Sequence, residues 1–250
     1  METAIILASF GVIDEKIREK TTDVLFNEIV KEFPKNTVVQ AYTSKFIIKK
    51  LGGKFLSVEE QINKLVGKKL IIMPTHLING EEFKKKIKIF ESEEIRVINP
   101  IFAFEDEIFN YERLLKIILK KYPIVDENLI LVGHGSKSEH NEFYEKFQEF
   151  VDKNYKNIHV GVLEENDVPS YENVLERLKK LEKRKIFLAP LLFNGGSHVE
   201  LDIKEKWRKK LENENYEVGV YVDGLGTFEE FRRIYIEKIG RILYDLPKNS

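Results

Sequence analysis

The sequence contains no cysteine, which excludes disulfides, zinc ribbons, iron–sulfur clusters and thiol catalysis. Any metal site must therefore use histidine, carboxylate or amide oxygen ligands. Long apolar runs are also missing, since none approaches the roughly 18 residues that a membrane-spanning helix needs. The first residues lack the basic segment of a signal peptide and are typical of a first strand. We therefore expect a cytoplasmic protein that does not bind membranes.

A strong net charge is missing as well. The 41 Lys and Arg residues nearly balance the 42 Asp and Glu residues, so we expect no attraction to nucleic acid. No phosphate-binding G-x-x-x-x-G-K-[ST] loop is present, and Gly224-Leu225-Gly226 does not extend into G-x-G-x-x-G. The G-x-S-x-G motif of a hydrolase nucleophile is absent too. We therefore expect no nucleotide cofactor. The sequence does not give the oligomeric state, and a homo-oligomer is possible.

Strands and helices alternate along the whole chain. A hydrophobic content of 42% in 250 residues is typical of a globular protein with room for a sizeable core. Apolar and β-branched runs predict strands at 4–9, 37–42, 70–74 and 95–98, and again from 129, 157, 185 and 217. Helical patterns separate them, including one continuous helix over 14–33 and another over 199–211. This alternation favours right-handed crossovers and parallel sheets.

The pattern begins again after Pro123, which indicates an internal duplication. We expect an α/β fold of two similar lobes, residues 1–124 and 125–250, each a parallel sheet flanked by helices, with an active-site cleft between them. The predicted superposition places Phe10-Gly11 on His134-Gly135, Thr43-Ser44 on Glu164-Glu165, and Pro74 on Pro190. Titratable residues cluster at strand ends in the second lobe. That lobe is therefore expected to carry a metal site.

Three strand ends of the second lobe lead to His134, Glu164 and His198. Because parallel strands end at one edge of a sheet, where α/β proteins bind ligands, we expect these side chains to converge. Neutral imidazoles suit Co²⁺, Ni²⁺ and Fe²⁺, a carboxylate adds negative charge, and histidine accepts protons near neutral pH. The pattern predicts a site for metal binding and proton transfer. A single histidine after a strand is also compatible with a hydrogen-bonded loop residue.

Taken together, these strand ends resemble those of the class II tetrapyrrole chelatases, specifically the anaerobic cobalt chelatase (CbiK) family. The matching segments follow the family's order along nearly the whole chain and are Ser9-Phe10-Gly11, Ala41-Tyr42-Thr43-Ser44, residues 47–51, residues 76–83, Gly133-His134-Gly135, residues 161–164, Gly195-Gly196-Ser197-His198 and residues 223–226. The resemblance implies two flavodoxin-like lobes around an open cleft. It also implies the insertion of Co²⁺ into sirohydrochlorin, without ATP, in anaerobic cobalamin (vitamin B12) biosynthesis.

The resemblance implies roles for particular residues. The substrate metal is expected on His134, Glu164 and His198, which are the expected catalytic residues, and the two histidines would also accept the ring protons. Sirohydrochlorin carries many carboxylates, so we expect donors for it around the cleft. Candidate contacts for the tetrapyrrole in the first lobe are Ser9, Phe10, Thr43, Ser44 and His76. His76 is equally compatible with a buried, hydrogen-bonded residue.

Alternatives remain within and beyond the family. A sibling chelatase would insert Fe²⁺ or Ni²⁺ into a related tetrapyrrole, and side chains alone do not separate these metals. A non-catalytic carrier would bind the metal or the ring without turnover. Two departures from the family pattern, Ser136 in place of alanine and Ser197 in place of an acidic residue, concern the metal preference more than the reaction class. Of the other histidines, His159 is predicted to be structural and His140 to be exposed.

Overall fold

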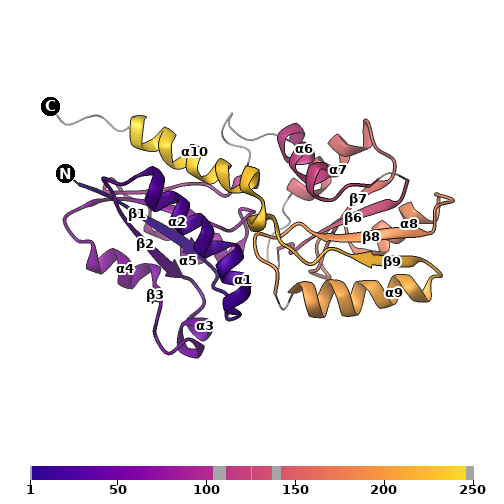
Figure 1. Ribbon diagram of the computed structural model, residues 1–250, viewed down its shortest axis with the longest axis horizontal. Coiled ribbons are helices and arrows are strands. Elements are labelled where there is room, and N and C mark those ends of the chain that lie inside the picture. Colours follow the sequence, from indigo (N-terminus) through magenta and orange to yellow (C-terminus); the bar gives the residue numbers. More distant parts are fainter. Residues whose placement is uncertain (1, 104–110, 125, 137–141, 197, 246–250) are drawn as a thin grey trace. The chain divides into compact units, whose positions relative to one another are not determined.

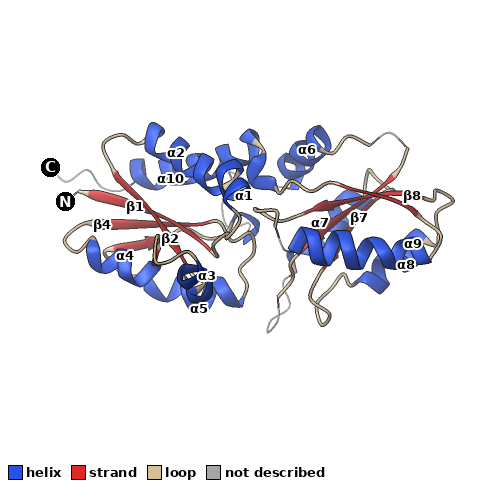
Figure 2. Ribbon diagram, turned by 60° about the horizontal axis from the view of Figure 1, so that its bottom comes forward, coloured by secondary structure: helices blue, strands red, loops and turns tan. Residues whose placement is uncertain are grey.

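The computed structural model describes residues 2–103, 111–124, 126–136, 142–196 and 198–245, except the side chains of 198–200 and 245. Two parallel sheets flanked by helices make up the fold, which confirms the predicted α/β class (Figures 1 and 2). Contacts divide the chain into two compact units. Unit 1 is Met1–Phe109 with Glu229–Ser250, and unit 2 is Asn110–Phe228. Within the described residues, none of the helices combines the length and the apolar character needed to cross a membrane.

Unit 1 contains a five-stranded parallel sheet in the order β3-β2-β1-β4-β5. Its strands are β1 (Thr3–Ser9), β2 (Thr37–Tyr42), β3 (Leu56–Ser57), β4 (Lys69–Pro74) and β5 (Ile95–Val97). The central strand β1 is buried from Ala4 to Ser9 because both faces of the sheet are covered. The two-residue strand β3 at the edge was not predicted, since so short a segment leaves no alternation to detect.

Helices cover both faces of the unit 1 sheet (Figure 2). They are α1 (Glu15–Lys20), α2 (Thr22–Glu32), α3 (Lys45–Lys50), α4 (Val58–Lys64), α5 (Glu81–Lys86), α10 (Glu229–Asp245) and the short 3-10 helices η1 (Lys88–Phe90) and η2 (Ile101–Ala103). The prediction of one continuous helix over 14–33 is wrong, because the helix is interrupted at Thr21. The Thr21 hydroxyl donates a hydrogen bond of 2.7 Å to the Ile17 carbonyl, an alternative to the helical ladder that ends α1.

Unit 2 contains a four-stranded parallel sheet in the order β7-β6-β8-β9. Its strands are β6 (Asn128–Gly133), β7 (Ile158–Val162), β8 (Lys185–Pro190) and β9 (Glu217–Val220). Its helices are α6 (Tyr111–Lys121), α7 (Phe143–Asp152), α8 (Tyr171–Leu178), the π-helix η3 (His198–Trp207), α9 (Arg208–Asn213) and the 3-10 helix η4 (Leu225–Thr227). The helix predicted over 199–211 is therefore a π-helix followed by an α-helix.

Each unit includes one helix from the other half of the chain. The division into units that the contacts give therefore differs from the boundary expected between residues 124 and 125. Helix α6 follows the last strand of unit 1 but packs in unit 2, where Tyr111 stacks on Phe147 and Phe150 of α7. Helix α10 follows unit 2 but packs on α2 of unit 1 (Figure 1). There the Arg232 guanidinium donates to both Glu28 carboxylate oxygens, at 2.8 and 2.7 Å. These contacts are tertiary, which is why alternation along the chain did not reveal the exchange.

The register of the sheets supports the predicted duplication and corrects it by one residue. Ala8 pairs with Pro74 in unit 1, and Val132 pairs with Pro190 in unit 2, so Phe10 corresponds to His134. Beyond the strands, the Ser44 N–H donates to the Phe10 carbonyl at 3.2 Å. The Glu164 N–H donates to the His134 carbonyl at 3.1 Å. The counterpart of Glu164 is therefore Ser44, whereas the prediction paired it with Thr43.

Candidate functional site

The carboxyl edge of the unit 2 sheet brings His134 and Glu164 together. Strand β6 lies between β7 and β8, and its hydrogen bonding to β7 continues past the strand ends. The Leu163 N–H donates to the Gly133 carbonyl at 3.0 Å, and the Glu164 N–H donates to the His134 carbonyl. These bonds hold the two side chains next to each other. Their Nδ1 and Oε1 atoms are 3.4 Å apart.

The His134–Glu164 pair is accessible to solvent. The His134 side chain is 45% exposed and that of Glu164 is 22% exposed. The Nδ1 atom that faces Glu164 is itself buried, so the exposed part of the imidazole is the remainder of the ring. Imidazole nitrogen and carboxylate oxygen are ligands for divalent transition metals. An imidazole is also a proton acceptor, and the adjacent carboxylate stabilises the charge that forms. The geometry therefore suits metal binding and proton transfer.

The two glycines on either side of His134 are each required for a different steric reason. Gly135 has φ +85°, a conformation that favours glycine, and a Cβ there would lie 3.1 Å from both Asp167 Oδ2 and Glu164 Cβ. At Gly133 a Cβ would lie 2.3 Å from Cε1 of the buried Tyr144 ring. The turn thus fits tightly between Tyr144 on one side and the Glu164 loop on the other.

Sequence reasoning missed two residues that contact this turn. Asp167 is 2% exposed and accepts a hydrogen bond of 2.7 Å from the Ser136 N–H. The Tyr144 hydroxyl accepts from the Gly135 N–H at 3.4 Å, and burial raises the pKa of this tyrosine well above its usual range. Neither residue belongs to a local motif. Only the tertiary structure brings them to the turn.

The third predicted ligand, His198, is the first residue of η3. The backbone places it after β8, which is the neighbour of β6 on the side opposite β7. Its side chain lies outside the described part of the structure, so its role stays a prediction. Among the described side chains, no three His, Asp or Glu groups converge as metal ligands. The far end of η3 is held by Trp207, whose ring lies directly over Gly161 of β7.

The equivalent edge of unit 1 contains the residues predicted to contact the tetrapyrrole. Ser9 and Thr43 are only 2% and 7% exposed, so they present little surface to a ligand. Phe10 is 47% exposed and presents an apolar ring at the place of His134. Ser44 caps helix α3 by accepting from the Ile47 N–H at 3.4 Å. His76 follows β4 and is partly buried.

The remaining histidines differ in their surroundings. His159 lies within β7, is 1% exposed and accepts a hydrogen bond of 3.3 Å from Arg177 Nε. Burial, with a smaller contribution from the Arg177 charge, lowers the pKa of His159 to about 4. It is therefore neutral at physiological pH and is shielded from solvent. His140 lies outside the described residues.

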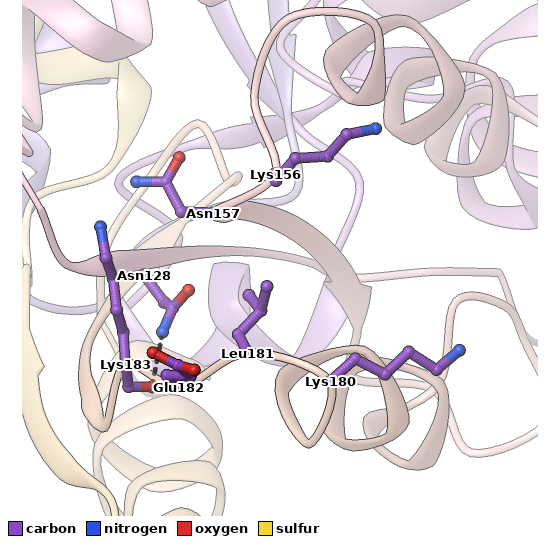
Figure 3. Close-up of a pocket in the computed structure, with 7 residues that line it drawn as sticks. All are labelled: Asn128, Lys156, Asn157, Lys180, Leu181, Glu182 and Lys183. Atoms are coloured by element: carbon purple, nitrogen blue, oxygen red, sulfur yellow. Dashed lines mark hydrogen bonds between the residues drawn. The ribbon is translucent and has the colours of Figure 1, made fainter.

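A pocket of about 490 Å³ lies at the opposite edge of the unit 2 sheet, where β6 and β7 begin (Figure 3). It is lined by Asn128, Lys156, Asn157, Lys180, Leu181, Glu182 and Lys183. The lysine amines point in different directions (Figure 3). Lys156 donates to the Asp152 carbonyl at 2.9 Å, and Lys183 pairs with Asp126. The lysines therefore do not form a focused anion site, and the pocket is a weaker candidate than the His134 edge.

Comparison with known proteins agrees with the resemblance seen in the strand ends. The family model described as cobalt chelatase (CbiK) matches residues 3–243. The sirohydrochlorin cobaltochelatase of Salmonella typhimurium is 20% identical over 263 residues, covering 97% of this chain and 97% of that protein. The sirohydrochlorin cobaltochelatase CbiKC of Nitratidesulfovibrio vulgaris is 24% identical over 256 residues, covering 94% of this chain and 88% of that protein.

A solved structure shares the fold. The structure of SirB from Bacillus subtilis with Fe³⁺ has a TM-score of 0.63 to this chain at 15% sequence identity. The match covers 96% of this chain and 95% of SirB. At this identity the likeness concerns the fold, and it confirms the predicted chelatase-like architecture of two parallel sheets with flanking helices.

Proposed function

Because the chain belongs to the cobalt chelatase (CbiK) family, we propose that it inserts Co²⁺ into sirohydrochlorin, the cobaltochelatase step of anaerobic cobalamin biosynthesis. The single observation that carries the proposal is the His134–Glu164 pair, 3.4 Å apart and accessible at the carboxyl edge of a sheet. Relatives of similar length named as sirohydrochlorin cobaltochelatases support the choice of reaction. We also propose that the reaction proceeds in the cytoplasm and without a nucleotide.

The chemistry needs a metal donor and a proton acceptor at one place. Insertion exchanges two ring N–H protons for one divalent cation, so two protons leave for every metal that enters. His134 and Glu164, together with His198, would hold Co²⁺ through nitrogen and oxygen ligands and leave positions open for the ring nitrogens. As the metal passes to the ring, the released imidazoles of His134 and His198 can each accept one of the two departing protons. Weak, exchangeable binding suits a metal that must leave.

The tetrapyrrole needs apolar contact for its ring and donors for its carboxylates. We propose that Phe10 of unit 1 contributes to its binding, with His76 as a secondary candidate because both of its ring nitrogens are buried. Phe10 is exposed, and exposed apolar side chains near it in the chain or across the adjoining α3 turn are Ile13 at 46% and Phe46 at 65%. Lys45, at the start of α3, is an exposed cation for a carboxylate. Ser9, Thr43 and Ser44 are secondary candidates because burial or helix capping occupies them.

The identity of the metal is the finer part of the proposal. Nitrogen and oxygen ligands accept Fe²⁺ and Ni²⁺ as well as Co²⁺, with affinities that follow the metal more than the site. Solved structures of SirB proteins from Bacillus subtilis contain Fe³⁺ in one case and cobalt in another, so iron stays a candidate beside cobalt. We propose Co²⁺ first because the matching family model and both full-length relatives carry the cobalt name.

The experiment follows the optical spectrum of sirohydrochlorin during metal insertion. Catalytic amounts of protein are mixed with sirohydrochlorin and Co²⁺, Fe²⁺ or Ni²⁺, with and without ATP, and with protoporphyrin in a parallel series. The proposal expects multiple turnovers, fastest with Co²⁺ and sirohydrochlorin, and no effect of ATP. His134→Ala should remove the activity. Lys156→Ala, at the opposite edge of the same sheet, is the matched control and should retain it.

The outcomes separate the alternatives. Faster turnover with Fe²⁺ or Ni²⁺ would replace cobalt but keep the chelatase. Tight stoichiometric binding of metal or ring without turnover would identify a carrier. Normal insertion by His134→Ala would remove the proposed catalytic residue.

A further inference from the structure

The backbone of the His134 turn is bound by residues of neighbouring segments. The carbonyls of Gly133 and His134 accept hydrogen bonds from the N–H groups of Leu163 and Glu164, the two residues that follow β7. The next two N–H groups of the turn donate to side chains. The Gly135 N–H donates to the Tyr144 hydroxyl, and the Ser136 N–H donates to the Asp167 carboxylate. The orientation of the imidazole is therefore set by a turn whose polar groups are held on both sides.

Asp167 connects the two loops that carry His134 and Glu164. Its Oδ2 accepts from the Ser136 N–H at 2.7 Å and its Oδ1 accepts from the Val168 N–H at 2.8 Å. Its own N–H donates to the Glu164 carbonyl at 3.2 Å. One buried residue thus fixes the backbone after β6 against the backbone after β7. Hydrogen bonds to a carboxylate are stronger than those between neutral groups, so this link is a firm one.

Unit 1 shows that the fold does not require a carboxylate here. Ser44 corresponds to Glu164, so three residues further Ile47 corresponds to Asp167. Both contact the equivalent glycine, since a Cβ on Gly11 would lie 3.1 Å from Ile47 Cγ2, as one on Gly135 would from Asp167 Oδ2. Ile47 is 7% exposed and fills this place with hydrocarbon. Because burying a carboxylate is costly, its use in unit 2 calls for a reason other than building the turn.

We propose that Asp167 is a positioning residue that sets the geometry of the His134–Glu164 pair for the divalent metal. It does not touch the metal. It acts through the Ser136 N–H on the turn that orients His134, and through the Glu164 carbonyl on the loop that carries the carboxylate. Outer partners of this kind orient metal ligands, and losing them weakens metal binding. The inference rests on the proposed function.

The test replaces Asp167 by asparagine, which has nearly the same shape but brings an NH₂ group against one of two N–H donors. Asp167→Asn is expected to raise the Kd for Co²⁺, measured on the protein alone, by about 10-fold to 100-fold. The visible absorption bands of bound Co²⁺ should change because the ligand geometry changes. The KM for sirohydrochlorin should stay within about two-fold of the wild-type value, because the substitution weakens metal binding and not the binding of the tetrapyrrole.

The matched control is Ile47→Ala, which loosens the equivalent place in unit 1. It should lower the melting temperature while leaving the Kd for Co²⁺ and the Co²⁺ spectrum unchanged. If Asp167→Asn fails to fold, Asp167→Glu serves instead. It keeps the charge but moves the carboxylate by one methylene, and the same rise in Kd is expected.

The failures of the two proposals are distinguishable. A folded Asp167 variant with the wild-type Kd and spectrum overturns the positioning role, even when wild-type insertion is active and His134→Ala is inactive. A Kd change no larger than that of Ile47→Ala overturns it as well. A wild-type protein that neither binds Co²⁺ nor inserts it overturns the proposed function and this inference together.

Discussion

The carboxyl edges of the two sheets share one backbone pattern and carry different side chains. In unit 1, a chain turn after β1 places Phe10 beside Ser44, joined by a hydrogen bond of 3.2 Å between their backbones. In unit 2, the same bond at 3.1 Å places His134 beside Glu164. The ladder beyond the strand ends thus fixes where side chains stand in both units. Which side chains stand there decides whether the edge suits a metal.

The comparison extends to residues that do not face solvent. Ile47 and Asp167 fill the same place next to the aligned glycines. One strand position inside the sheet, Val39 in unit 1, corresponds to His159 in unit 2, because each pairs with the isoleucine at the equivalent place of the central strand. Unit 2 therefore has polar, buried groups at places where unit 1 has apolar residues. Exchanging residues between equivalent places separates what the fold needs from what the chemistry needs.

The largest effect is expected for His134→Phe, which gives unit 2 the residue of unit 1. Metal insertion should fall by about 100-fold or more, because both a metal ligand and a proton acceptor are lost. The fold should persist, since Phe10 occupies the equivalent turn. The measurement is kcat/KM from the sirohydrochlorin spectrum, alongside thermal unfolding. Retained insertion would show that unit 2 chemistry does not depend on this residue.

The next effect concerns acid stability and His159. Its pKa of about 4 in the folded protein lies below the ordinary value of 6.5, so the unfolded chain binds more protons between these values. The contribution of His159 to the free energy of unfolding is therefore fully present above pH 6.5 and is lost as the pH falls towards 4. By pH 4.5 the loss should be about 2–3 kcal/mol.

The check is His159→Val, which copies Val39. Denaturant unfolding of both proteins at pH 7 and pH 4.5 gives the difference between the two pH values, so any constant loss from the substitution cancels. The variant should show a smaller drop than the wild type. Equal drops would assign the acid sensitivity to other groups, such as the Asp152 carboxylate that pairs with Arg177.

A smaller effect should distinguish the two turn glycines. Gly11 and Gly135 have φ values of +110° and +85°, so alanine at either place should cost about 1–2 kcal/mol in the free energy of unfolding. Only Gly135→Ala should also reduce metal affinity, because its Cβ presses on Asp167 and Glu164. Chemical unfolding and Co²⁺ titration of both variants give the comparison. Equal metal affinities would mean that the turn tolerates displacement.

The smallest effect is expected at Ser44, which caps α3. Ser44→Ala should cost about 1 kcal/mol in the free energy of unfolding, because the Ile47 N–H loses its acceptor. The KM for sirohydrochlorin should stay unchanged if capping is its main role. A raised KM at unchanged stability would instead make Ser44 a substrate contact.

Much of the backbone followed from local sequence signals. The strand over 37–42 has the predicted bounds. The sequence Ser57-Val58-Glu59-Glu60 has the form of a capping box, and it starts α4, where the Glu60 carboxylate accepts a hydrogen bond of 2.7 Å from the Ser57 N–H. These features depend on neighbours in the chain, where hydrophobic alternation and capping residues can be read directly. The proximity of His134 and Glu164 also followed, since parallel strands end at one edge.

The parts that could not be predicted depend on distant contacts or on competing hydrogen bonds. The helix exchange rests on pairs such as Arg232 with Glu28, which lie far apart in the chain. Asp167 lies in a turn after β7 and has no local pattern to mark it. The break at Thr21 depends on a side-chain hydroxyl that competes with the helix. The one-residue error at Ser44 arose because intervals between strand ends do not fix register, whereas backbone hydrogen bonds do.

The most direct test of the contrast between the two edges is the NMR signal of the histidine rings during titration with paramagnetic Co²⁺. The chain has five histidines, so the signals can be assigned by single substitutions. Below one equivalent of Co²⁺, the ring signal of His134 should broaden and disappear first, while those of His76 and His159 persist. Loss of the His76 signal before that of His134, or no selective broadening, would contradict the assignment of the metal to unit 2.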